Sequence, residues 1–211
     1  SMTAIPLLAV AGLHPWTERS TMAPSIFIDT LGCRTNVADS SQLGAQLAAQ
    51  GYELVAHASK ADIVLVNSCT VTLGADRDVG KTLRRLRRAS PGQLLVVTGC
   101  LPTAQDNHRV LDDANVAISG NDPETVVARL AIAVKEAGLV LPTPDAKPSP
   151  RAYEATNNLS RANIKIHEGC DCHCAYCIVP TARGGPVSRP VEEVLADVEG
   201  ALDAGFTELV I

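Results

Sequence analysis

The sequence reads Asp62-Ile63-Val64-Leu65-Val66-Asn67 at the point that decides the fold. A short apolar run bounded by polar residues is typical of a strand that is buried on both faces of a parallel sheet. Two similar runs, Ile26–Leu31 and Gln93–Thr98, lie before and after it. Helical patterns over Ser40–Gln50 and Ala75–Ala89 separate the three runs. This alternation predicts an α/β fold, an open parallel sheet with helices on both faces.

Capping and turn signals set the predicted ends of these elements. Asp39 or Ser40 is suited to cap the first helix, and Gly51 is suited to end it. The other elements predicted in this part are strands at Glu53–Ala56 and Val116–Ser119 and a helix at Pro123–Ala137. In a doubly wound sheet the first four strands are expected in the order 2-1-3-4.

A proline-rich stretch over residues 141–150 marks a domain boundary, because such stretches form extended linkers. After it, a strand at Asn163–His167, a helix at Val191–Ala204 and a strand at Thr207–Ile211 are typical of the start of a β/α barrel that then stops. We therefore expect four parts. They are an extension or tag remnant over 1–24, a sheet domain over 25–138, a linker over 139–160 and an incomplete barrel over 161–211.

Composition limits the class of protein. The chain has 211 residues, of which 46% are hydrophobic and 19% are charged, so it is globular rather than disordered. Its net charge of −5 gives no global sign of nucleic-acid binding, and no apolar run reaches the length of a membrane span. Seven cysteines clustered at metal-ligand spacing favour a reducing cytoplasm over a disulfide framework.

Three cysteines share one short loop. Cys170, Cys174 and Cys177 form a C-x3-C-x2-C triplet. Three thiolates can hold three irons of a [4Fe–4S] cluster and leave the fourth iron open for a small molecule. A structural zinc loop is the alternative, although the second cysteine or histidine pair of such sites is missing. Cys172 is either a spare ligand or a tolerated small residue, and His173 is more typical of a loop position than of a ligand.

A second set of three cysteines is spread along the chain. Cys33, Cys69 and Cys100 each follow the end of a predicted strand. The carboxyl ends of neighbouring parallel strands meet at one edge of the sheet, so the three thiols are expected to converge there. Gly32 and Gly99 precede two of them and allow the backbone to approach a bulky ligand. The alternative is that these are buried structural cysteines.

These features carry a resemblance to a known family. The loop, with Tyr176 before its last cysteine, resembles the signature of radical S-adenosylmethionine (SAM) enzymes. From Ser25 to its end the chain is similar to the methylthiotransferase family within that class. The stretches that carry this similarity are Thr30–Asn36, Asn67–Thr72, Thr98–Cys100, Gly169–Pro180 and Ala182–Gly184.

The resemblance implies cofactors and their ligands. Cys33, Cys69 and Cys100 map onto an auxiliary [4Fe–4S] cluster, and Cys170, Cys174 and Cys177 map onto the cluster that chelates and cleaves SAM to a 5′-deoxyadenosyl radical. Tyr176 and Arg183 are then expected near bound SAM. The family installs a methylthio group on an unactivated carbon, with one SAM as methyl donor and a second as source of the radical.

The same resemblance implies substrates and partners. The Thr30–Arg34 and Cys69–Thr72 stretches and Ala75–Arg77 are most similar to the branch that modifies N6-threonylcarbamoyladenosine 37 of tRNA. Sister branches modify isopentenyl-adenosine 37 or an aspartate of a ribosomal protein. The expected partners are a tRNA anticodon loop and an electron donor such as flavodoxin or ferredoxin. Because family members continue through a full barrel, this chain is expected to be inactive alone, and a non-catalytic iron–sulfur module or a zinc-stabilised nucleic-acid-binding protein remain alternatives.

Basic residues gather in the helix after Cys69. A solvated helix face and a patch that contacts RNA phosphates both explain such a run. The residues are Arg77, Lys81, Arg84, Arg85, Arg87 and Arg88.

Overall fold

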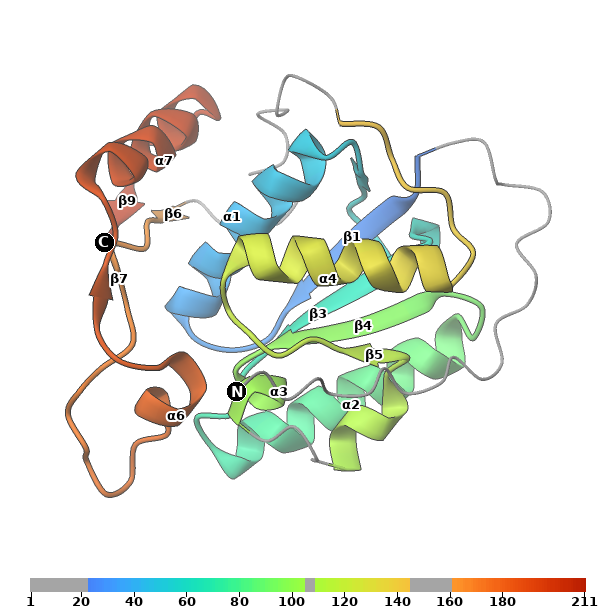
Figure 1. The fold of residues 1–211 in the computed structure, drawn as a ribbon, viewed down its shortest axis with the longest axis horizontal. Helices are drawn as coiled ribbons and strands as arrows, with labels where there is room; N and C mark the ends of the chain where they lie inside the picture. The colour runs from blue at the N-terminus through green and yellow to red at the C-terminus, as the bar shows by residue number, and fades with distance from the viewer. Residues whose placement is uncertain (1–22, 105–108, 145–160) are drawn as a thin grey trace.

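The computed structural model describes residues 23–104, 109–144 and 161–211. Its centre is a five-stranded sheet in which every pair of neighbours is parallel, in the order β2-β1-β3-β4-β5 (Figure 1). This confirms the predicted α/β class and the predicted 2-1-3-4 order. The strands are β1 (Ser25–Thr30), β2 (Glu53–Leu54), β3 (Ile63–Ser68), β4 (Leu94–Gly99) and β5 (Val116–Ala117).

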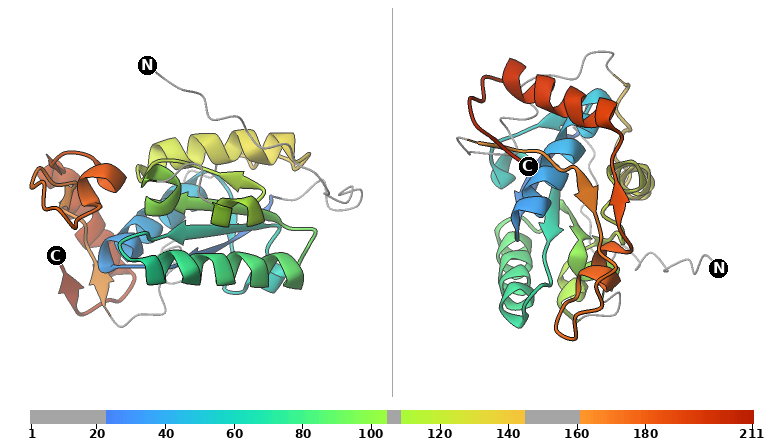
Figure 2. Two further views of the ribbon diagram at one scale, coloured as in Figure 1. Left: turned by 90° about the horizontal axis from the view of Figure 1, so that it is seen from below. Right: turned by 90° about the vertical axis from the view of Figure 1, so that its left-hand side faces the viewer.

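Helices cover both faces of this sheet, as Figure 2 shows from two sides. One face packs on α1 (Arg34–Ala49) and α4 (Pro123–Glu136), and the other packs on α2 (Leu73–Ala89). Residues of β3 alternate between the two layers, since Ile63 and Leu65 join the first core and Val64 and Val66 join the second. Short helical segments complete this part at η1 (Ala58–Lys60), α3 (Cys100–Ala104) and η2 (Arg109–Asp113).

The start of α1 differs from the prediction. The helix begins at Arg34, with Cys33 at its N-cap, and so Asp39 and Ser40 lie inside it rather than at its end. Both are buried, and both have partners elsewhere in the fold: the Ser40 hydroxyl accepts hydrogen bonds from Thr30 and Asn67. In the sequence, Asp39 and Ser40 therefore look like helix caps, although their side chains bind groups in distant parts of the fold. The predicted position of Pro123 is confirmed, because it lies in the first turn of α4 and Asp122 caps that helix.

The C-terminal part contains two small sheets. Strands β6 (Ala162–Asn163) and β9 (Leu209–Val210) pair in parallel around α7 (Val191–Asp203), a β–α–β unit of the kind that barrels repeat. Strands β7 (His167–Glu168) and β8 (Val187–Ser188) pair antiparallel, and α6 (Val179–Arg183) lies between them in the chain.

The predicted strand at Asn163–His167 was wrong, because it is split into β6 and β7. Lys165 lies between the two short strands, and its side chain reaches Asp39 on α1. The chain changes partner along this stretch, because β6 pairs with β9 and β7 pairs with β8. Most of the predicted linker, 139–160, and of the predicted extension, 1–24, lies outside the described residues. The domain boundaries stay a prediction.

Candidate iron–sulfur site

Three cysteines lie at the carboxyl edge of the sheet, as the sequence predicted. Cys33 caps α1 beyond β1, Cys69 directly follows β3, and Cys100 directly follows β4 and opens α3. Cys69 and Cys100 are buried, whereas Cys33 is exposed. The three residues therefore project from three adjacent strands toward one end of the sheet.

Glycine allows this close approach. Gly32 has a φ of +139°, and a Cβ there would lie 2.6 Å from the Cys69 Cβ and 2.8 Å from the Asn36 Oδ1. Asn36 in turn accepts a hydrogen bond from the Cys33 thiol at 3.2 Å, and its amide donates to Asn67 Oδ1 at 3.1 Å. A buried polar web thus holds the β1–α1 turn against the end of β3.

The thiols are close enough to influence one another electrostatically. Burial raises the pKa of the Cys100 thiol. The Arg183 guanidinium opposes that rise through its charge and a hydrogen bond, while Cys69 and Cys33 add to it. Among the described residues the three sulfurs do not form a group within 4.8 Å of one another.

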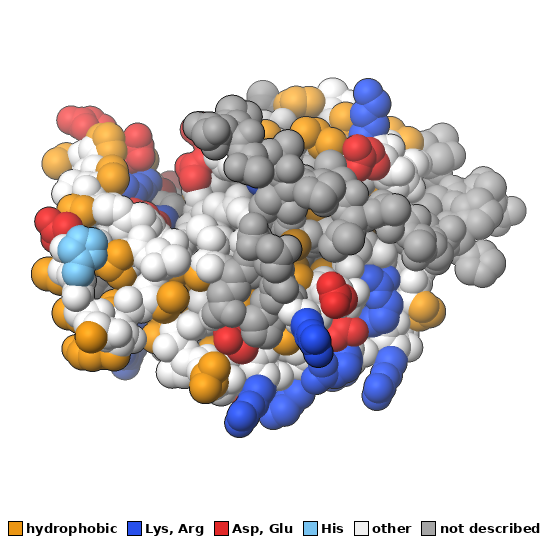
Figure 3. Space-filling view, turned by 60° about the horizontal axis from the view of Figure 1, so that its bottom comes forward, with side chains coloured by type: hydrophobic (Ala, Val, Ile, Leu, Met, Phe, Trp, Pro, Cys, Tyr) orange, Lys and Arg blue, Asp and Glu red, His pale blue; other side chains and the backbone are white. Residues whose placement is uncertain are grey.

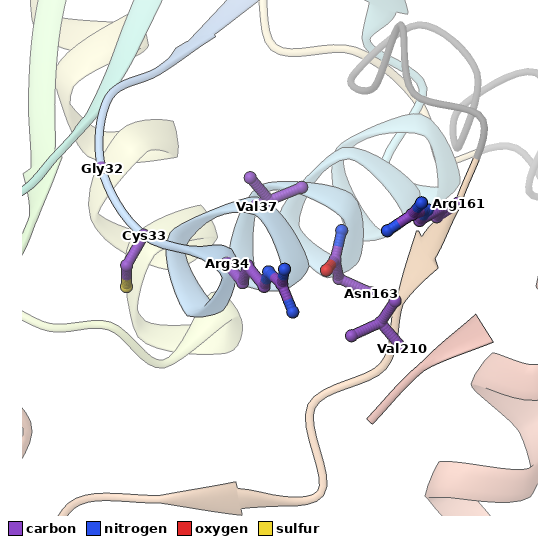
Figure 4. Close-up of a pocket in the computed structure, with 7 residues that line it drawn as sticks. All are labelled: Gly32, Cys33, Arg34, Val37, Arg161, Asn163 and Val210. Atoms are coloured by element: carbon purple, nitrogen blue, oxygen red, sulfur yellow. The ribbon is translucent and has the colours of Figure 1, made fainter. Parts of the chain in front are cut away.

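A cavity lies beside the first turn of α1. Figure 4 shows this space of about 370 Å³, between Arg34 and Val37 on α1 and Asn163 and Val210 on the paired strands β6 and β9. Cys33, at the start of α1, also lines this cavity, so the cavity extends from the carboxyl edge of the sheet into the C-terminal part.

The second cysteine set lies in the loop between β7 and α6. Cys170 donates its N–H to the Gly184 carbonyl at 3.1 Å, and a Cβ at Gly169 would lie 2.1 Å from the Gly185 oxygen. The loop is thus closed at its base by backbone contact that only glycine permits. Within it, the Cys177 N–H donates to the Cys174 carbonyl at 3.0 Å.

The assignment of Cys170, Cys174 and Cys177 as the ligands in this loop stays a prediction. Among the described residues the single group of at least three metal-donor side chains within 4.8 Å of one another is Cys170, Asp171 and Cys172. Cys174 and Cys177 are not in that group. A hydrogen bond to Cys170 and the charge of that neighbour raise the pKa of the exposed Cys172 thiol.

Arg183 has a role that its sequence context did not predict. Its guanidinium bridges Asp39 Oδ2 on α1 and Glu168 Oε1 on β7, at 2.8 Å each. Lys165 bridges the other oxygens of the same two carboxylates, at 2.5 and 2.7 Å. We call Asp39, Lys165, Glu168 and Arg183 the interface ring. The side chains of Asp39, Lys165 and Arg183 are 7–8% exposed and that of Glu168 is 22% exposed, so the ring is largely shielded from water.

The charges of the interface ring stabilise one another. Burial lowers the pKa of Lys165, but Asp39 and Glu168 outweigh burial and the net shift is upward. For Glu168 burial raises the pKa, but hydrogen bonds from Lys165 and Arg183 outweigh it and the net shift is downward. Lys165, Glu168 and Arg183 are therefore held in their charged forms.

The interface ring connects the two cysteine sets. Arg183 ends α6, the helix that follows the cysteine loop, and α6 packs on α3, which begins at Cys100. Asn121 adds a hydrogen bond of 2.7 Å to the Ala182 carbonyl. In Figure 1 the C-terminal part accordingly lies at the end of the sheet where β1, β3 and β4 finish. A cleft of about 740 Å³ runs along this seam, lined in part by Gln42, Glu124 and Arg189.

The remaining predicted residues can now be placed. Tyr176 is 91% exposed, and its contact with SAM stays a prediction. Arg183 lies beside Cys100, and its contact with SAM likewise stays a prediction. Sequence reasoning missed Lys165 and Glu168 altogether, and it misread Asp39 as a cap. The one available signal was that Asp39 is the single acidic residue in the sequence of this helix.

The basic residues of α2 form an exposed face, which Figure 3 shows along the lower surface. Arg87 is half-buried and donates to the Asp113 carbonyl. Lys81, Arg84 and Arg85 pair with Asp78, Asp113 and Asp29 at 3.0, 3.4 and 3.8 Å. These are exposed pairs of little energetic weight. A solvated face accounts for them, and RNA contact stays a prediction.

The residues present fit the proposed clusters. Each set supplies three thiols, and glycines without a Cβ stand beside both sets. Arg183 next to Cys100 opposes part of the rise in the thiol pKa that burial causes, and so it assists the thiolate form that iron requires.

Thiols thus lie at the carboxyl edge of an α/β sheet, and the helix that follows the cysteine loop packs against that edge. Residues 25–119 match the family described as "Uncharacterized protein family UPF0004". The chain is 33% identical over 193 residues to the tRNA-2-methylthio-N(6)-dimethylallyladenosine synthase of Solibacter usitatus, covering 88% of this chain and 43% of that protein.

Two further relatives carry related names. The chain is 34% identical to the ribosomal protein uS12 methylthiotransferase RimO of Alkalilimnicola ehrlichii, covering 90% of this chain and 42% of that protein. It is 32% identical to the threonylcarbamoyladenosine tRNA methylthiotransferase MtaB of Chlamydia pneumoniae, covering 86% and 41%. The chain thus spans less than half the length of these relatives, which are all named for methylthio chemistry on different substrates.

In the described parts of the chain, no helix is both long enough and apolar enough to cross a membrane.

Proposed function

We propose that this chain forms the cluster-binding part of a radical SAM methylthiotransferase. The observation that carries the proposal is the docking of the loop with Cys170, Cys174 and Cys177 against the sheet edge with Cys33, Cys69 and Cys100, through Arg183. The names of the similar proteins support the reaction type. The proposed cofactors are two [4Fe–4S] clusters and SAM.

The clusters would supply the electron for SAM cleavage and a place for sulfur, while the protein positions them. Each set of thiols leaves one iron without a protein ligand. Gly32 lets the β1–α1 turn lie against Cys69, and Gly169 lets the cysteine loop close on Gly185, because a side chain at either position would meet those atoms. The interface ring fixes α6 against α1 and α3, and so it sets the separation of the two sets.

The proposed substrate is N6-threonylcarbamoyladenosine 37 in a tRNA anticodon loop, with flavodoxin or ferredoxin as electron donor. Its support is the Thr30–Arg34 stretch and the relative named MtaB. The second candidate is ribosomal protein uS12, because several similar proteins bear the RimO name.

Two measurements test this proposal. Anaerobic reconstitution of the chain is expected to give about eight irons, as two four-iron clusters. Replacing Cys33, Cys69 and Cys100 together by Ala is expected to remove about half of that iron, and unchanged iron would contradict the two-cluster arrangement.

The substrate is tested in a strain that lacks the gene. Mass spectrometry of tRNA nucleosides is expected to show loss of the methylthio-threonylcarbamoyl nucleoside. Its persistence, together with loss of the uS12 modification, would transfer the assignment to the second candidate. If neither modification changes, and the isopentenyl-adenosine derivative is also intact, the chain belongs to a non-catalytic module instead.

A further inference from the structure

The solvent-exposed side of α2 carries a charge of one sign. The helix contains six basic and two acidic residues, a net charge of +4, whereas the whole chain has a net charge of −5. Its buried side consists of Asp76, Val79, Gly80, Leu83 and Leu86, so the basic side chains are left on the side that faces water. Figure 3 shows Lys and Arg side chains gathered along the lower surface. The charge of this helix is therefore opposite to that of the rest of the molecule.

The basic residues form a narrow stripe along the helix. Five of them are exposed, and we call them the basic stripe: Arg77, Lys81, Arg84, Arg85 and Arg88. With 3.6 residues per turn and a rise of 1.5 Å per residue, these positions fall within an arc of about 100° and extend over about 16 Å. This shape matches a linear array of negative charges, such as the phosphates of one RNA strand.

The basic stripe starts beside the candidate iron–sulfur site. Cys69 is separated by three residues from the start of α2, and Arg77 lies in the second turn of that helix. Because β3 ends at the carboxyl edge of the sheet, α2 starts at that edge and carries the stripe away from it (Figure 1). Val71 and Leu73 lie between Cys69 and the stripe, and they are 52% and 78% exposed. An uncharged surface thus separates the stripe from the thiols.

We propose that the basic stripe binds the phosphate backbone of the substrate RNA, and that the target base lies over Val71 and Leu73 toward the sheet edge. This inference rests on the proposed function, because it takes RNA rather than uS12 as the substrate. Four of the five residues of the stripe are Arg, whose planar guanidinium can donate two parallel hydrogen bonds to a phosphate. The ion pairs of Lys81, Arg84 and Arg85 are exposed and weak, so phosphates can replace the carboxylates.

An acidic protein, such as the proposed electron donor, fits this surface less well. Arg85 pairs with Asp29 at the end of β1, and Arg84 pairs with Asp113 of η2, which follows β4. In the sheet, β1 and β4 lie on opposite sides of β3. Carboxylates therefore flank the stripe on both sides, and they repel a broad acidic surface more than a single strand of phosphates.

The test is binding of an anticodon stem–loop RNA to the 211-residue chain, measured by fluorescence anisotropy between about 50 and 200 mM salt. Arg77→Gln/Arg88→Gln removes both ends of the stripe and breaks none of the ion pairs above. We expect binding about tenfold weaker and a slope of log K against log salt smaller by about 1.4, because each phosphate contact on a single strand contributes about 0.7. The matched control, Arg129→Gln/Lys135→Gln, removes two exposed charges from α4 on the other face of the sheet, and it should change the affinity less than about twofold.

Three results would overturn the proposal. The first is an equal effect of the two double variants, and the second is no RNA binding by the unchanged chain. The third is equal competition by poly-glutamate at the same concentration of charge, which would assign the stripe to an acidic protein.

Iron content separates this proposal from the proposed function. Arg77→Gln/Arg88→Gln is expected to load about eight irons, as the unchanged chain is. Full iron loading without RNA binding would refute the role of the basic stripe and leave the cluster assignment standing. RNA binding through the stripe by a chain that takes up no iron would contradict the proposed function and leave the stripe standing.

Discussion

Replacing Asp39 by Asn should loosen the seam between the two parts of the chain. Asp39 is the one member of the interface ring that comes from α1, and it contacts both Lys165 and Arg183. Without its charge, two cations share the single carboxylate of Glu168 and one buried positive charge has no counter-ion. Breaking a buried ion pair from one side costs about 3–5 kcal/mol. Because the cleft beside the ring admits water, we expect about 3 kcal/mol.

The readouts are urea unfolding and hydrogen exchange of residues 161–211. The exchange protection of α6 and β7 should fall, while that of β3 and β4 should not. Lys81→Ala is the control, because it removes an exposed pair with Asp78 on the same protein and should cost at most about 0.5 kcal/mol. The double variant Asp39→Ala/Lys165→Met should recover part of the loss, since Glu168 and Arg183 then balance each other. If Asp39→Asn costs no more than Lys81→Ala, the ring does not hold the seam.

Two further predictions concern single positions. Gly32→Ala should lower the free energy of unfolding by about 2 kcal/mol or more and lower iron uptake at the sheet edge, because the new Cβ would meet Cys69. The control is Gly138→Ala, which is also at positive φ but in open space and should cost only about 1 kcal/mol. Equal urea midpoints for the two variants would refute the contact with Cys69. Tyr52→Phe should leave stability at neutral pH unchanged or raise it by up to about 1 kcal/mol, because the buried hydroxyl has no partner in the described structure. Burial raises the pKa of Tyr52 to about 12, so the wild-type chain should lose stability as the pH rises above about 10 and the Phe variant should lose less; parallel alkaline curves would refute this.

The sheet was predictable because its signals are local. The run around Ile63–Val66 is apolar on both faces, and its neighbours in the chain repeat that pattern, so the order and the strand-end positions of Cys33, Cys69 and Cys100 followed from topology. The start of α1 was not predictable in this way. The polar residues in its first turns are satisfied by groups far along the chain: Asn36 by Asn67, 31 residues away.

The interface ring illustrates the same limit at the site. Asp39 meets Lys165 and Arg183 at separations of 126 and 144 residues. The spacing of residues within one helix or strand cannot predict such contacts. The cysteine loop differs again, because its ligand set was inferred from sequence spacing alone, and the set of Cys170, Cys174 and Cys177 stays a prediction.

The interface ring also divides its charge unequally between the two parts that it joins. The sheet domain contributes one negative charge, from Asp39, and the C-terminal part contributes a net positive charge, from Lys165 and Arg183 with Glu168. Each part taken alone therefore presents an uncompensated charge at the seam, and docking neutralises both. A chimera that joins this sheet domain to the cysteine loop of a distant homologue should assemble only if the incoming loop carries the same excess of one positive charge. The complementary charges at the seam therefore require that the two parts be inherited together.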